Sequence, residues 1–106
     1  MAEKVYDFVI IGSGLGGLQC AYILADHDFS VCVLEKNQQL GGSLQVFSRD
    51  KTIFDTGVHY LPALDEDQPL HSYFKYFGLT ESVKWKKMDS RFDQISFDDG
   101  SKFHHA

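Results

Sequence analysis

Cysteines and basic residues are both scarce in this chain. It has two cysteines among 106 residues, and 10 Lys and Arg against 15 Asp and Glu, for a formal charge of −5. Cys20 and Cys32 cannot build the disulfide framework of a small secreted protein and lack metal-site spacing, so we expect two buried, inert thiols. The acidic balance argues against nucleic acid as a partner, because phosphate-backbone binding needs clustered Lys and Arg.

Long apolar runs are also missing. No run approaches the roughly 20 residues needed to span a bilayer, and the first residues lack the pattern of a secretory signal peptide. We therefore expect a cytoplasmic protein. The adjacent pair His104-His105 has no further ligands nearby in sequence, and strand alternation would send the two side chains to opposite faces. No metal site is expected.

The first third of the chain predicts a strand, a glycine turn, a helix and a second strand. Residues 5–11 (VYDFVII) form a β-branched apolar run, typical of a strand buried on both faces of a parallel sheet. Apolar residues then recur at helical spacing over residues 15–27, and residues 30–34 read as another buried strand. This is a βαβ unit, whose crossover should be right-handed.

The remainder predicts a hairpin, a helix and the start of a β-rich region. Residues 46–48 and 52–54 form the hairpin around a polar turn, and residues 69–77 form a helix that ends at Gly78. Asp99-Gly100 predicts a second hairpin with its return strand at 101–105. The fold class is α/β, an incomplete domain with a Rossmann-type unit over residues 1–60 and a β-rich cap or substrate region over 61–106.

The glycine turn carries the first chemical signal. Gly12, Gly14 and Gly17 match G-x-G-x-x-G between a strand and a helix, the context in which this motif binds dinucleotides. The first glycine allows the sharp turn, the second lets the backbone approach a pyrophosphate, and the third lets the helix pack closely on the strand. The helix N-terminus then offers free N–H groups to the anion.

Glu35 is the second signal. It lies 23 positions after Gly12, at the end of the second predicted strand, close to the offset of the acid that binds ribose hydroxyls in such units. Its carboxylate would accept hydrogen bonds from both hydroxyls of an adenosine ribose and would repel a 2′-phosphate. The two signals together predict an adenine dinucleotide, and they do not separate FAD from NAD.

A family resemblance distinguishes FAD from NAD. Glu35-Lys36, Leu40-Gly41-Gly42 and Asp55-Thr56-Gly57 resemble the N-terminal signature of the two-dinucleotide-binding-domain flavoproteins. Residues 54–60 (FDTGVHY) are most similar to the retinol saturase, carotenoid isomerase and phytoene desaturase branch. Amine oxidases of this superfamily usually have Arg after the Gly-Gly pair, where this chain has Ser43. The resemblance implies FAD as cofactor, with the Gly-Gly turn beside its ribityl and pyrophosphate groups.

The motifs and the resemblance together define a set of expected site residues. His59 is the catalytic candidate, and the alternative is a structural histidine hydrogen-bonded to the backbone. The expected cofactor-binding residues are Gly12, Ser13, Gly14, Leu15, Gly16, Gly17, Glu35, Lys36, Gly41, Gly42, Ser43, Gly57 and Val58.

The resemblance implies an FAD-dependent oxidoreductase that acts on carbon–carbon double bonds of an isoprenoid or polyene. Such apolar substrates are compatible with transient contact with a membrane surface. We expect the chain to be the opening segment of a longer enzyme and to be inactive by itself. The alternatives are an inactive truncated fragment, a nucleotide-binding module that senses NAD, and an amine oxidase-type flavoenzyme. The sequence carries no signal for an oligomeric state.

Overall fold

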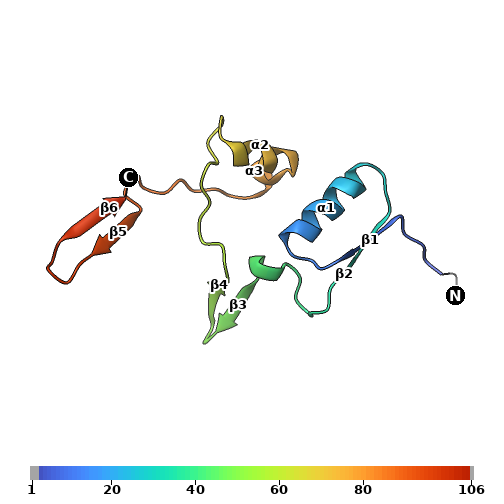
Figure 1. Cartoon of the computed structure of the whole chain (residues 1–106), viewed down its shortest axis with the longest axis horizontal. Coiled ribbons are helices and arrows are strands. Elements are labelled where there is room, and N and C mark those ends of the chain that lie inside the picture. The colour runs from blue at the N-terminus through green and yellow to red at the C-terminus, as the bar shows by residue number, and fades with distance from the viewer. Residues whose placement is uncertain (1–2, 106) are drawn as a thin grey trace. The chain divides into compact units, whose positions relative to one another are not determined.

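The parallel pair predicted for the first third of the chain is present in the computed structural model, which describes residues 3–105 (Figure 1). The chain divides into two units, residues 1–65 and 66–106. The first unit contains β1 (Phe8–Ile11), α1 (Leu15–Asp26), β2 (Val31–Leu34), the 3₁₀ turn η1 (Gly42–Leu44), β3 (Val46–Arg49) and β4 (Thr52–Asp55). The second contains α2 (Pro69–Tyr76), α3 (Leu79–Ser82), β5 (Asp93–Ser96) and β6 (Lys102–His105).

Strands β1 and β2 pair in parallel, and α1 connects them and packs against both. The register runs from Phe8 opposite Val31 to Ile11 opposite Leu34. Strand β1 therefore starts three residues later than the predicted strand over residues 5–11, at the residue that pairs with the first residue of β2. The predicted helix and second strand differ from α1 and β2 by one residue at one end.

A carboxylate–serine contact holds the amino end of this pair. Ser30 donates to Asp7 Oδ2 from its backbone N–H at 2.8 Å and from its hydroxyl at 2.6 Å. The N–H of Asp7 donates in return to Ser30 Oγ at 3.0 Å. The hydroxyl and the N–H of Ser30, in that order, hold the pKa of Asp7 below its usual value. Because both residues directly precede the paired segments, the contact fixes the register of β1 against β2.

The first hairpin follows the predicted pattern. Strands β3 and β4 pair antiparallel, and each is one residue longer than predicted. Asp50 and Lys51 both have positive φ, 50° and 63°, as a two-residue hairpin turn of type I′ requires. Phe47 and Phe54 stack across the two strands with ring centroids 5.2 Å apart.

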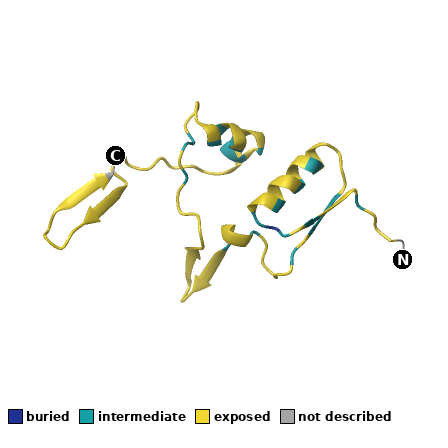
Figure 2. Cartoon of the chain, viewed as in Figure 1, coloured by how far each residue is buried: buried dark blue, intermediate teal, exposed yellow. Residues whose placement is uncertain are grey.

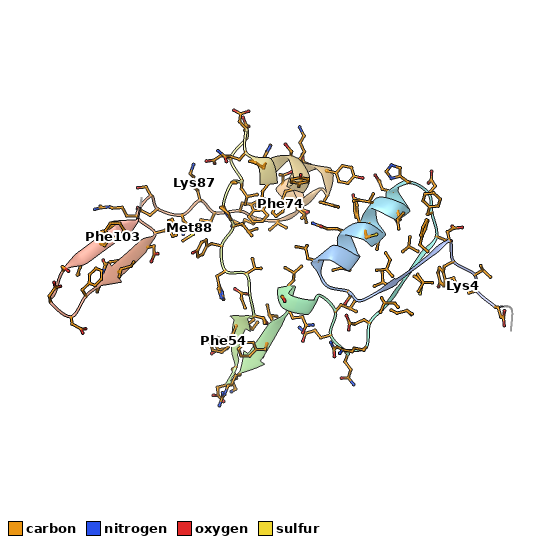
Figure 3. All side chains as sticks on the ribbon, viewed as in Figure 1. Lys4, Phe54, Phe74, Lys87, Met88 and Phe103 are labelled. Carbon is orange, nitrogen blue, oxygen red and sulfur yellow. The ribbon has the colours of Figure 1, made fainter. Side chains whose placement is uncertain are left out.

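The second unit contains one helix that the sequence did not reveal. Gly78 ends the helical run with φ 69°, as predicted, but α3 begins directly after it. This short helix is held by tertiary contacts: Trp85 Nε1 donates to Leu79 O at 3.0 Å, and the Trp85 ring lies 5.4 Å from that of Phe74. Strands β5 and β6 form the predicted second hairpin. Figure 3 shows Phe74 on α2 and Phe103 on β6.

The apolar residues of the chain remain exposed. Among the described residues no hydrophobic side chain is buried (Figure 2). The prediction that the first strand is buried on both faces is wrong for this chain, since Val9 is 57% and Ile11 88% exposed. Cys20 is exposed and Cys32 half-buried, both as free thiols, so the prediction of two buried cysteines is also wrong. The reason is the same in each case: a two-stranded parallel sheet needs cover on its faces and edges, and a single helix supplies little of it.

Across the described part of the chain, no helix is both long enough and apolar enough to span a bilayer.

The exposed apolar faces predict strong binding of a hydrophobic dye. We expect 8-anilinonaphthalene-1-sulfonate to fluoresce brightly with the 106-residue chain under native conditions, because such dyes report exposed apolar surface. The substitution Ile11→Asn should lower the signal, since Ile11 is 88% exposed on β1. Fluorescence no higher than with a typical globular protein would show that these faces are covered in solution.

Candidate functional site

The glycine turn joins β1 to α1 and leaves the start of the helix open. Gly12 has φ 104°, in the left-handed region that favours glycine, and its N–H donates to Leu34 O at 2.7 Å. Gly14 is the N-cap of α1, which begins at Leu15, and no side chain caps this end. A Cβ added at Gly14 or Gly16 would meet nothing within 4 Å. The first turn of α1 therefore offers N–H groups beside open space, as anion binding requires.

Gly17 has a different reason to be glycine. A Cβ at this position would lie 2.1 Å from the carbonyl oxygen of Gly12 and 3.4 Å from Cγ2 of Ile10. Since no real Cβ approaches a backbone oxygen so closely, helix and strand can meet here only without a side chain. This is the packing role that the motif predicts for its third glycine.

Glu35 follows β2 and turns its carboxylate back to the glycine turn. The backbone N–H of Ser13 donates to Oε2 of Glu35 at 3.0 Å, and the Ser13 hydroxyl donates to the same oxygen at 2.5 Å. The N–H of Asn37 donates to Oε1 at 3.0 Å. These bonds, led by that of the Ser13 hydroxyl, lower the pKa of Glu35 from 4.5 to about 2. The carboxylate is thus an anion throughout the physiological range.

Ser13 is fully buried, and it is the one buried residue in the described chain. Besides donating to Glu35, its hydroxyl oxygen accepts a hydrogen bond from the N–H of Gly41 at 3.2 Å. Three segments that are distant in sequence therefore meet at one oxygen atom: the glycine turn, the end of β2 and the Gly-Gly pair.

The Gly41-Gly42 pair lies directly against the glycine turn. Gly41 and Gly42 both have positive φ, 106° and 56°. A Cβ at Gly42 would come within 3.0 Å of Gly14 Cα, too close for a side chain without a shift of backbone. Two glycine-rich backbone segments thus lie side by side, which the sequence alone did not establish.

The remaining expected cofactor residues lie around this centre. Gly57 follows β4, and a Cβ on it would lie 3.2 Å from the carbonyl oxygen of Ser43. The segment Asp55-Thr56-Gly57 therefore packs against η1. Leu15, Lys36 and Val58 have exposed side chains. Their predicted contact with a cofactor stays a prediction.

His59 lies near Asp55, but the two side chains are too far apart for a hydrogen bond. Its Nδ1 is 3.8 Å from Asp55 Oδ2, and both side chains are more than half exposed. The catalytic role of His59 and the structural alternative both stay predictions. Within residues 3–105, no cluster of three or more His, Cys, Asp or Glu side chains is placed to hold a metal ion.

Sequence reasoning missed the residues that hold the loop between β2 and β3. Gln39 donates from Nε2 to Val46 O at 2.9 Å, and Gln45 donates from Nε2 to Gln39 O at 3.2 Å. Asn37 contributes only its backbone N–H to Glu35. No motif marks these three residues, and their polar composition gave no sign of these contacts.

The chain is similar in sequence to a family of nucleotide-binding domains and to several longer proteins. A family model described as an NAD(P)-binding Rossmann-like domain matches residues 10–77. The all-trans-retinol 13,14-reductase of Macaca fascicularis is 40% identical over 92 residues, which are 86% of this chain and 15% of that protein. The carotenoid 3,4-desaturase of Haloarcula japonica is 34% identical over 98 residues, 91% of this chain and 19% of that protein. The phytoene desaturase of Cercospora nicotianae is 37% identical over 100 residues, 90% of this chain and 15% of that protein.

These matches confirm the predicted fold class and the resemblance to the retinol saturase and phytoene desaturase branch. The chain spans only 15% to 19% of the length of these three relatives. A dinucleotide is the ligand class that the family description indicates.

The Glu35 carboxyl should titrate at an unusually low pH. We expect carboxyl ¹³C NMR to give a midpoint at about 2 in the unmodified chain and one nearer 4.5 in Ser13→Ala, because the Ser13 hydroxyl contributes most to the shift. Since the folded pKa is the lower one, the contact stabilises the fold above pH 4.5, and this stability is lost as the pH falls through about 2. Ser30→Ala, at the other end of the sheet, should leave the midpoint unchanged. A midpoint near 4.5 in the unmodified chain would contradict the contact.

Two neighbouring glycines of α1 should respond oppositely to alanine. Gly17→Ala forces a Cβ against the Gly12 carbonyl and should destabilise α1 by about 1–3 kcal/mol, the usual range for overpacking. Gly16→Ala meets open space and should stabilise the helix by up to about 1 kcal/mol. Urea titration followed by far-ultraviolet circular dichroism measures both, and equal effects of the two substitutions would refute the close approach.

Proposed function

The chain belongs to the NAD(P)-binding Rossmann-like domain family, and on this premise we propose that it is the FAD-binding part of an oxidoreductase that acts on carbon–carbon double bonds of an isoprenoid or polyene. The observation that carries the proposal is the meeting of the glycine turn, Glu35 and the Gly41-Gly42 pair at the buried Ser13 hydroxyl. It supports a single site for the pyrophosphate and the ribose of a dinucleotide.

The pyrophosphate fits the start of α1. Gly14 and Gly16 have open space where side chains would stand, and this helix end carries neither a side-chain cap nor an acidic residue in its first turn. N–H groups and the helix dipole favour an anion at such a position. We propose that Gly12, Gly14 and Gly17 hold the turn in place, and that the N–H groups following Gly14 bind the phosphates.

The ribose fits Glu35. An ionised carboxylate accepts hydrogen bonds from hydroxyl groups and repels a phosphate on the same sugar. With its pKa at about 2, Glu35 retains the negative charge needed for both effects. The site therefore favours FAD or NAD over NADP.

The Gly41-Gly42 pair favours FAD over NAD. Gly42 lies against Gly14, which supports a backbone-lined surface that continues beyond the pyrophosphate, where FAD carries its ribityl chain. The relatives named above are a retinol reductase, a carotenoid desaturase and a phytoene desaturase. Their names support a polyene as the substrate of this chain in its complete enzyme.

When bound, FAD supplies hydride transfer to or from a substrate carbon. The residues of this chain bind and orient the cofactor: the glycine turn fixes the pyrophosphate, Glu35 fixes the ribose, and the Gly41-Gly42 turn would limit the path of the flavin chain. His59 stays the candidate of this chain for proton transfer in that reaction. The chain thus contributes cofactor binding, and substrate contacts would come from other parts of a complete enzyme.

Ligand titration tests this function. We expect FAD to bind the 106-residue chain, with quenched flavin fluorescence and a raised melting temperature, and to bind more tightly than NAD or NADP. Glu35→Gln should weaken FAD about tenfold, because hydrogen bonds to a charged group contribute about 1.5–3 kcal/mol. Glu81→Gln removes an exposed charge on α3 and should change nothing. Selective binding of NAD would refute the flavoprotein assignment and favour a module that senses NAD.

A further inference from the structure

The basic residues of the chain gather in one short segment between α3 and β5. Four of the 10 Lys and Arg residues lie within residues 84–91, although the whole chain carries a formal charge of −5. They are Lys84, Lys86, Lys87 and Arg91, and the one acidic residue among them is Asp89. All five residues are exposed. Residues 83–92, the basic segment, are therefore a local positive charge on an acidic chain.

Apolar side chains alternate with these charges. Val83, Met88 and Phe92 are each between 41% and 48% exposed. A surface cavity of about 470 Å³ is lined by residues of the basic segment. Its lining residues are Lys86, Lys87, Met88, Asp89 and Phe92. The basic segment thus presents cationic and apolar groups on one exposed surface, and Figure 3 shows Lys87 and Met88 on it.

Two contacts hold the basic segment in place. Trp85 donates from Nε1 to Leu79 O at 3.0 Å, and its ring lies 5.4 Å from that of Phe74. Near the other end, the N–H of Arg91 donates to Asp89 Oδ1 at 2.8 Å. Because Trp85 is engaged with α2 and α3, it is poorly placed to stack on the bases of a nucleic acid, which such proteins use for affinity.

We infer that the basic segment is a docking site for an anionic lipid surface. Each Lys or Arg near such a surface contributes about fivefold in affinity, and the apolar side chains of Met88 and Phe92 suit the boundary between headgroups and acyl chains. Physiological salt screens exposed charges beyond about 8 Å, so more distant acidic residues weaken this attraction little. The inference goes beyond the proposed function and does not depend on it.

Trp85 gives the experiment its signal, because it is the single tryptophan of the chain and lies within the basic segment. The 106-residue chain is titrated with vesicles while Trp85 fluorescence is recorded. We expect a blue-shifted emission with phosphatidylcholine vesicles that contain about one-third phosphatidylserine, and no change with pure phosphatidylcholine. The shift should disappear in about 0.5 M sodium chloride, where screening acts within about 4 Å.

Charge substitutions locate the contact. Replacing the three lysines of the basic segment together (Lys84→Gln, Lys86→Gln and Lys87→Gln) should weaken binding to the anionic vesicles about a hundredfold. The control replaces three lysines outside the segment and has the same net charge: Lys4→Gln, Lys51→Gln and Lys102→Gln. This control should bind within about threefold of the unmodified chain, because charges outside the contact are screened.

Absence of binding to the anionic vesicles would overturn the inference, and so would equal binding to both kinds of vesicle. Equal weakening by the two triple variants would overturn it as well, because net charge would then suffice. A single-stranded oligonucleotide that binds more tightly than the anionic vesicles would show that the partner is nucleic acid. If the variant of the basic segment does not fold, the lipid and salt dependence of the unmodified chain decides. The FAD titration described above is independent of every one of these results.

Discussion

The hydrogen bond from the buried Ser13 hydroxyl to Glu35 is the contact on which the site depends. It joins the turn after β1 to the end of β2, and through Gly41 it brings in a segment 28 positions further along the chain. The described residues offer no buried apolar core that could do this instead. Polar contacts of defined direction therefore position the glycine-rich backbones, and the charge on Glu35 strengthens them.

A hydrogen-bonded pair of serine and carboxylate holds the two parallel strands together at each end. Asp7 and Ser30 meet before the strands begin, and Ser13 and Glu35 meet after they end. The acid precedes β1 in the first pair and follows β2 in the second, so each pair links the two strands. The second pair lies at the end of the strands where the glycine turn leads into α1, and it includes the acid that we propose as the ribose acceptor.

The sequence predicted the elements well because their signals are local. Gly12, Gly14 and Gly17 marked the turn, and the offset of Glu35 placed it at the end of the second strand. The Ser13 contact could not be predicted, because it depends on the direction of one hydroxyl across 22 positions of sequence. The burial of Ile11 and Cys20 was predicted wrongly. An apolar run shows that a strand or helix needs other residues to cover it, but it does not show that such residues are present. The short helix α3 has no sequence signal of its own and depends on Trp85.

Amide hydrogen exchange of Gly41, followed by NMR, tests the central contact most directly. The Gly41 N–H precedes η1 in a polar loop, and it donates its hydrogen bond to the Ser13 hydroxyl. The account predicts exchange about tenfold or more slower than in an unstructured chain, and loss of this protection in Ser13→Ala. Unprotected exchange in the unmodified chain would contradict the account, because the three segments would then not be joined at Ser13.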